Sequence, residues 1–151
     1  MKKGVKSILV PVNSSPHSEY AFRWACQVAR SNKAQLHALH VIEVPLSLPL
    51  EAEITAEVDR AEELLSRYER IASDEKYRGL QTGCLRARQA GMAIVREVEI
   101  KRAEMIIVGI PYNRTLGQCN MGAAASHIFQ YAPCQVILWR DPAPAPTFTG
   151  A

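Results

Sequence analysis

The sequence predicts an α/β domain in which a parallel sheet is covered by helices on both faces. Two observations favour it: apolar runs alternate with segments of helical period along the chain, and the runs at 7–12 and 105–108 are almost wholly apolar. Strands of this kind are typical of parallel sheets buried on both faces. The chain has 151 residues, 48% of them hydrophobic and 22% charged, which suits one domain with a sizeable core.

The first strand, expected at residues 7–12, leads into a helix with a strong start signal. Ser15 suits the N-cap, and Pro16 suits the first helical position, where its missing N–H costs nothing. The polar residues 31–33 end this helix. Its apolar positions at helical spacing are Ala21, Trp24, Ala25, Val28 and Ala29.

The second strand is expected at 35–44, and a loop with proline at both ends follows at 45–49. The longest helix runs from about residue 50 to residue 73. Charged residues fill one of its faces, and we interpret them as a solvated helix surface. Its apolar stripe comprises Ile54, Val58, Ala61, Leu65, Tyr68 and Ala72.

The second half of the chain continues the alternation, which predicts helices on both faces of the sheet and right-handed crossovers. One domain therefore spans residues 1–140, and the proline- and alanine-rich segment 141–151 is a flexible tail. The expected elements are a weaker strand at 80–87, a helix at 91–102 with Ile94, Val95 and Val98 inward, the strand at 105–108, a helix at 123–131 and a strand at 134–140.

Composition argues against several classes of function. The net charge of +3 is dispersed without a basic run, which argues against a nucleic-acid groove. No apolar run approaches the ~18 residues of a membrane span, and the apolar stretch at 8–12 is too short for a signal peptide, so we expect a cytoplasmic protein without membrane insertion. The four cysteines lack C-x-x-C spacing, and His37 and His40 face opposite sides of a strand, so no metal site is expected.

The segment 104–127 carries the main functional signal. The strand at 105–108 is followed by a loop with glycines at 109, 117 and 122 and then by a helix start. Backbone N–H groups and the positive end of a helix dipole converge on an anion in this geometry, and phosphate is the usual anion. A plain βα connection with tight turns has the same pattern, and neither common phosphate-loop motif occurs in the chain.

Ligands of open α/β sheets bind outside the carboxyl ends of the strands, where the strand order reverses. If that reversal lies between the first and fourth strands, Asn13 and Gly109 emerge side by side. The residues then predict a nucleotide-sized, phosphate-compatible crevice without a recognisable catalytic set. The cluster of Ser14, Ser15 and His17 resembles a catalytic one, but we interpret it as helix capping.

Three segments together resemble the universal stress protein family: ILVPVNSSPHSEYAFRWA near the start, LHVIEV, and IIVG…MG…YAPCQVILWR near the end. The resemblance covers residues 5 to 140. It implies a Rossmann-like, open five-stranded sheet with strand order 3-2-1-4-5. It also implies a homodimer built by antiparallel pairing of the fifth strands, here Gln135 to Trp139.

Nucleotide-binding members of that family carry G-x2-G-x9-G-[ST] after the fourth strand and an aspartate after the first. Gly109 and Gly122 match the first and third glycines. Tyr112 stands at the middle glycine, where it implies a differently shaped loop or a ring that fills the pocket, and Ala123 replaces the hydroxyl residue. Asn13, followed by Ser14, replaces the aspartate but keeps an acceptor and adds a donor.

The resemblance implies a regulatory module that binds an adenine nucleotide, ATP or AMP, at the crevice between the first and fourth strands. No catalysis, required cofactor or metal is expected. A nucleotide-free homodimeric interaction module is the alternative, and an adenylate-transferring enzyme is a third. The expected nucleotide-binding residues are Pro11, Val12, Asn13, Val41, Val108, Gly109, Arg114, Gly122, Ala123 and Ala124.

Overall fold

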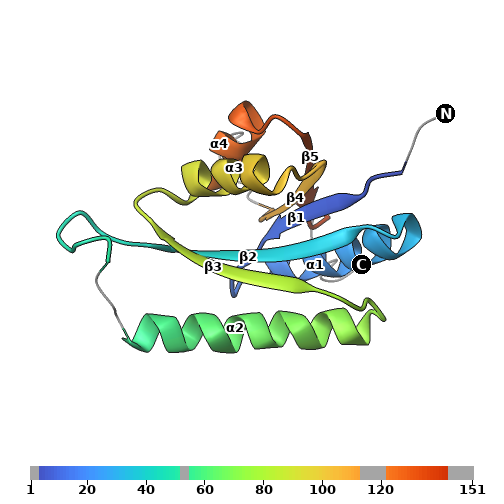
Figure 1. Ribbon diagram of the computed structural model, residues 1–151, viewed down its shortest axis with the longest axis horizontal. Helices are drawn as coiled ribbons and strands as arrows, with labels where there is room; N and C mark the ends of the chain where they lie inside the picture. The colour runs from blue at the N-terminus through green and yellow to red at the C-terminus, as the bar shows by residue number, and fades with distance from the viewer. Residues whose placement is uncertain (1–3, 52–54, 113–121, 143–151) are drawn as a thin grey trace, which may run out of the picture.

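A computed structural model describes residues 4–51, 55–112 and 122–142 of the chain. Strands and helices alternate along it as the sequence predicts, and the elements differ from the expected bounds only at their ends (Figure 1). The strands are β1 (Ser7–Pro11), β2 (Gln35–Glu43), β3 (Gln81–Ala87), β4 (Met105–Ile110) and β5 (Gln135–Arg140). The helices are α1 (Pro16–Asn32), α2 (Thr55–Asp74), α3 (Ala90–Lys101) and α4 (Ala123–Tyr131).

The strands form a single sheet in which every pairing is parallel. Their order is β3-β2-β1-β4-β5, which confirms the order implied by the resemblance. The chain first builds outward from β1 through β2 to β3 and then returns to β4 on the other side of β1. The reversal therefore lies between β1 and β4, where Ile8 pairs with Met105 and Leu9 with Ile106.

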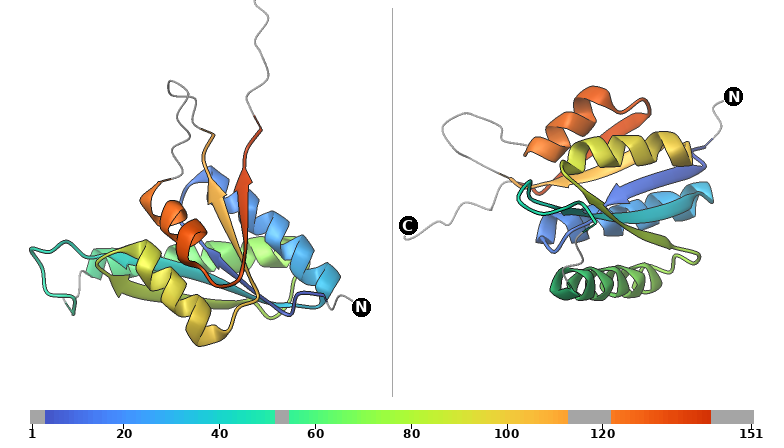
Figure 2. Two further views of the ribbon diagram at one scale, coloured as in Figure 1. Left: turned by 90° about the horizontal axis from the view of Figure 1, so that it is seen from above. Right: turned by 60° about the vertical axis from the view of Figure 1, so that its left-hand side comes forward.

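The helices cover both faces of the sheet (Figures 1 and 2). On one face α1 and α2 enclose a core that includes Phe22 and Tyr68, both fully buried. On the other face α3 and α4 pack on a second core around Ile106 and Ile128. The residues expected inward on α3, which are Ile94, Val95 and Val98, are all buried.

One local prediction is wrong, and a second is confirmed only in part. Trp24 lies at the spacing of the buried α1 positions, but it is 37% exposed, because Ala21, Ala25 and Ala29 already fill that contact. Ser15 occupies the N-cap position of α1, but its side chain makes no capping hydrogen bond. The Ser15 hydroxyl instead contacts Asn13 and His17.

Parts of the sequence analysis fall outside the described residues. The flexible tail is described only at 141–142, Ile54 lies in the gap 52–54, and Gly117 lies in the gap 113–121. Within the described ranges, no helix is both long and apolar enough to cross a membrane. The same ranges contain no group of three or more histidine, cysteine or acidic side chains placed to hold a metal ion.

Candidate functional site

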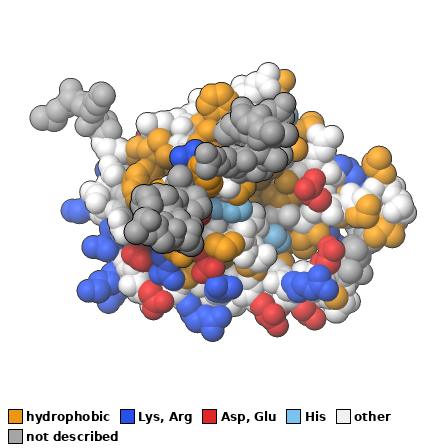
Figure 3. Space-filling view, turned by 180° about the vertical axis from the view of Figure 1, so that it is seen from behind, with side chains coloured by type: hydrophobic (Ala, Val, Ile, Leu, Met, Phe, Trp, Pro, Cys, Tyr) orange, Lys and Arg blue, Asp and Glu red, His pale blue; other side chains and the backbone are white. Residues whose placement is uncertain are grey.

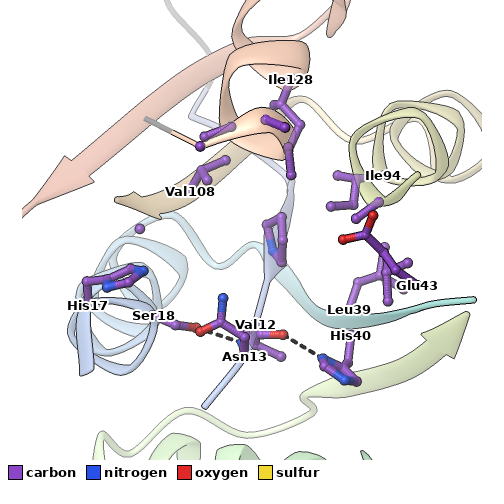
Figure 4. A pocket seen from close by; sticks show the side chains of 18 of the residues that line it. Val12, Asn13, His17, Ser18, Leu39, His40, Glu43, Ile94, Val108 and Ile128 are labelled. Atoms are coloured by element: carbon purple, nitrogen blue, oxygen red, sulfur yellow. Dashed lines mark hydrogen bonds between the residues drawn. The ribbon is translucent and has the colours of Figure 1, made fainter. Parts of the chain in front are cut away.

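A cavity of about 560 Å³ opens at the carboxyl ends of β1, β2 and β4, beside the first turn of α4 (Figure 4). Its volume falls within the range of about 300–1,000 Å³ that is usual for small-molecule sites. Arg114 lies outside the described residues. The other nine predicted binding residues all line the cavity, namely Pro11, Val12, Asn13, Val41, Val108, Gly109, Gly122, Ala123 and Ala124.

The turn after β1 is fixed by a buried tyrosine that comes from α2. The Tyr68 hydroxyl donates to the Asn13 carbonyl at 2.6 Å, and Ser18 Oγ lies 2.7 Å from the same hydroxyl. Ser18 Oγ in turn accepts from the Asn13 N–H at 3.0 Å (Figure 4). Burial raises the pKa of Tyr68 to about 12, so its O–H proton stays in place at neutral pH.

The Asn13 side chain is partly used by its own turn. Its Oδ1 accepts from the Ser15 N–H at 2.9 Å and also contacts the Ser15 hydroxyl, as in an Asx-turn. Its amide nitrogen has no partner among the described residues and is left to serve a ligand. Asn13 therefore presents a donor at the crevice, where an aspartate would present only acceptors.

His17 lies at the edge of the same cavity, on the first turn of α1 (Figure 4). Ser15 Oγ is 3.0 Å from its Nε2 atom. Burial lowers the pKa of His17, and the more distant charge of Asp141 opposes this effect, so the ring is neutral near pH 7. The Ser15 hydroxyl therefore contacts both Asn13 and His17 and links the two residues across the turn.

Gly109, at the end of β4, is required by packing rather than by a turn. A Cβ atom at this position would lie 2.5 Å from the His17 carbonyl oxygen and 3.0 Å from Ala21 Cβ. Only glycine allows α1 to approach β4 this closely. The glycine thereby brings His17 and the strand end to the same wall of the cavity.

Gly122 serves a different purpose at the start of α4. Its φ of 82° and ψ of 155° belong to a region that essentially only glycine adopts. Its carbonyl accepts the first helical bond, from the Ser126 N–H at 3.0 Å. The N–H groups of Ala123 and Ala124 precede that ladder and lie at the positive end of the helix dipole, on the cavity wall.

Tyr112, which occupies the middle glycine position of the family motif, does not line the cavity. The guanidinium of Arg140 lies over its ring, 4.8 Å from the centroid. This cation–π contact holds the ring against the end of β5. The possibility that Tyr112 fills the pocket is therefore wrong.

Several lining residues were missed by the sequence analysis. Three of them have the spacing of ordinary core residues, so the sequence does not show that they line a cavity: Leu39, Ile94 and Ile128. His40 and Glu43 carried a usable signal, because they are polar positions near the end of an apolar strand. Among the described lining residues Glu43 is the only carboxylate, and there is no lysine or arginine.

Comparison with known proteins identifies the chain's relatives. The sequence profile of the universal stress protein family matches residues 4–140. The chain belongs to the universal stress protein family. A universal stress protein of Methanocaldococcus jannaschii is 26% identical over 143 residues, covering 91% of this chain and 83% of that one. A putative universal stress protein of Staphylococcus aureus is 27% identical over 139 residues, covering 89% and 84%.

Solved universal stress protein structures share the fold. A protein from Lactobacillus plantarum superposes with a TM-score of 0.73 at 23% identity, covering 90% of this chain and 98% of that one. One from Archaeoglobus fulgidus, in complex with dAMP, gives 0.71 at 19% identity with coverages of 90% and 98%. One from Arabidopsis thaliana, with AMP bound, gives 0.66 at 21% identity with coverages of 93% and 97%.

Proposed function

We propose that this universal stress protein is a regulatory module that binds an adenine nucleotide, ATP or AMP, in the crevice between β1 and β4, without catalysing a reaction on it. The observation that carries the proposal is the convergence of nine predicted residues on one nucleotide-sized cavity. The dAMP and AMP complexes of proteins with the same fold support it.

The chemistry of the cavity agrees with such a ligand. Leu39, Ile94 and Ile128 offer an apolar wall for a base, and the first turn of α4 offers N–H donors for a phosphate. Hydrolysis would need a positioned water and, as a rule, a carboxylate that holds a metal ion. Asn13 replaces the family's aspartate, and Glu43 alone among the described lining residues is a carboxylate, without a group of metal ligands around it, so we expect no multiple-turnover ATP hydrolysis.

The first test asks whether the purified protein carries or binds a nucleotide. Denaturation followed by chromatography detects a co-purified adenine nucleotide. A ligand added at 100 times its Kd should stabilise the fold by about 2.7 kcal/mol, which thermal melts with ATP, AMP and cyclic AMP will reveal. If none of these raises the Tm and nothing is released, the nucleotide-free interaction module is the better description.

The second test places the phosphates by a matched pair of variants at the start of α4. Ala123→Asp puts a negative charge where we place a phosphate, whereas Ala123→Asn has nearly the same shape and no charge. Both side chains are tolerated at a helix start. We expect calorimetry to show at least about tenfold weaker AMP binding for the aspartate variant than for the asparagine variant. Equal affinities would place the phosphates elsewhere.

We also propose that the protein forms a homodimer through β5. Among the described residues this strand pairs with β4 alone and forms an edge of the sheet. Val136, Ile137, Leu138 and Trp139 are all half-buried, so apolar side chains flank an open row of backbone groups. Antiparallel pairing with the same strand of a second copy would cover this edge.

A further inference from the structure

A second cavity lies next to the first, on the other side of the turn after β1. It has a volume of about 490 Å³ and lies between that turn and α2. Asn13 and His40 line both cavities, so the two are contiguous. Figure 4 shows His40 directed away from Ile94 and bonded to the Val12 carbonyl, at the boundary between them.

The second cavity is rich in arginine. Arg60, Arg67 and Arg70 line it, against a single carboxylate, that of Glu63. Positions 60, 67 and 70 lie on one face of the helix, and 10 residues at 1.5 Å per residue spread them along about 15 Å. The first cavity, by contrast, has a carboxylate and no arginine or lysine among its described lining residues.

Charged side chains of both signs line the two hollows beside α2. A groove on the outer face of the helix is lined by the acidic residues Asp59, Glu62, Glu63 and Glu69 and also by Arg70. Arg60 and Arg67 line the second cavity but not this groove, whereas Arg70 lines both. Figure 3 shows basic side chains interleaved with acidic ones along the lower edge of the molecule, which α2 forms, with histidines above them.

Two of the three arginines are available to a ligand. Arg67 is bound to Glu19 at 2.7 Å, and its side chain is 53% exposed. Arg60 and Arg70 have no ion pair or hydrogen bond to the rest of the described chain. Guanidinium groups without a carboxylate partner match phosphate oxygens in geometry and in charge.

We propose that this cavity is a second anion subsite, which takes a phosphate-bearing group. Arg60 and Arg70 supply the charge, and the Ser14 hydroxyl supplies a further donor at its inner end. A phosphate group held there can belong to a small soluble anion or to the head group of a lipid. The proposal does not depend on a nucleotide in the first cavity.

The test uses inorganic pyrophosphate as the probe, measured by isothermal titration calorimetry on the full-length protein. The double variant Arg60→Gln/Arg70→Gln removes two charges from the subsite. The control Arg78→Gln/Arg96→Gln removes two charges from exposed arginines elsewhere, after α2 and on α3. Circular dichroism melts of both variants establish that they are folded.

We expect the wild-type protein to bind pyrophosphate, and the subsite variant to bind it at least about tenfold more weakly, because charge-assisted hydrogen bonds are lost. The control should change the affinity by less than about threefold. Absence of wild-type binding, or an equal loss in both variants, would overturn the proposal. Wild-type binding to vesicles of phosphatidylserine and phosphatidylcholine without binding to pyrophosphate would also overturn it, and would assign the arginines to a membrane surface.

Discussion

Single polar atoms determine what the end of β1 offers to a ligand. The Asn13 backbone is held at both its N–H and its carbonyl, and its side-chain oxygen is used within the turn. One amide donor remains for the crevice. The two atoms that fix this arrangement, the hydroxyls of Ser18 and Tyr68, come from two different helices.

Removal of the Tyr68 hydroxyl tests this arrangement. Tyr68→Phe removes the donor to the Asn13 carbonyl and leaves Ser18 with the Asn13 N–H alone, so we expect the unfolding free energy to fall by about 1–3 kcal/mol and AMP affinity to fall with it. Tyr77→Phe is the matched control, because its hydroxyl also bridges two backbone groups, those of Leu36 and Ala34, at the opposite end of β2. A control that weakens AMP binding equally would argue against a local role for Tyr68.

His37 makes stability depend on pH. Burial lowers its pKa, and the charge of Lys101 lowers it further, against a smaller opposing effect of Glu97. Below the unfolded-state pKa of 6.5 the unfolded chain binds more protons than the folded one. Stability is therefore complete above that pH and declines as the pH falls toward the lowered pKa.

We expect the unfolding free energy measured in urea to decrease from about pH 7 to about pH 5. His37→Gln should flatten this slope, whatever its effect on stability at neutral pH. His17 has a lowered pKa for the same main reason, and its contribution to the slope remains in the variant. A variant with an unchanged slope would show that His37 does not titrate in this way.

At the scale of the elements, close approach of α1 to β4 builds one wall of the crevice. The contact depends on the missing side chain of Gly109 and on the small Ala21. It places the first turn of α1 directly over the strand end. The width of the crevice therefore depends on how closely helix and strand pack.

Gly109→Ala should reduce the unfolding free energy by about 1–3 kcal/mol, because the new methyl group would overlap the His17 carbonyl. Gly83→Ala on β3 is the matched control. Its methyl group would lie 3.7 Å from Leu39 Cδ1, an ordinary contact, so we expect a change below about 0.5 kcal/mol. Urea denaturation measures both, and equal losses would contradict the packing argument.

The sequence predicted these elements well because the strands and helices have clear periods and sharp ends. It also located the crevice, since polar residues such as Asn13 and glycines such as Gly109 follow apolar strands. It did not predict the link from Tyr68 to Asn13, because 55 residues separate the two partners. The exposure of Trp24 was missed because helical spacing does not show tertiary packing, and Ser15 takes the predicted N-cap position without the capping hydrogen bond.

At the scale of the whole molecule, the two edges of the sheet differ. The β3 edge alternates between exposed and half-buried residues, and β5 carries four consecutive half-buried apolar residues. Tyr20 of α1 stacks on Trp139 at 6.1 Å, which extends the apolar surface beyond the strand. This asymmetry favours β5 as the strand through which two copies associate.

Ile137→Lys should shift the protein from dimer to monomer, because a buried lysine in the centre of the interface has no partner. Thr82→Lys is the control, since it places the same charge at an exposed position on the opposite edge strand. Sedimentation velocity at micromolar concentration measures both. A wild-type protein that is monomeric would refute the proposed dimer. If Ile137→Lys remains dimeric, the interface does not lie at β5.

Gly109 and Gly122 look alike in a sequence, and saturation mutagenesis should score both positions as intolerant of substitution. The second-site mutations that restore function should nevertheless differ between the two positions. At Gly109 the obstacle is a neighbour, so suppressors that shrink or shift the start of α1 can restore part of what a substitution loses. At Gly122 no atom of the described residues lies within 4 Å of the position a side chain would occupy, and the obstacle is the backbone angle itself. Because the strain at Gly122 does not come from a neighbouring side chain, a second mutation elsewhere cannot relieve it. Selection for restored function after a substitution at Gly122 should therefore yield only reversion to glycine.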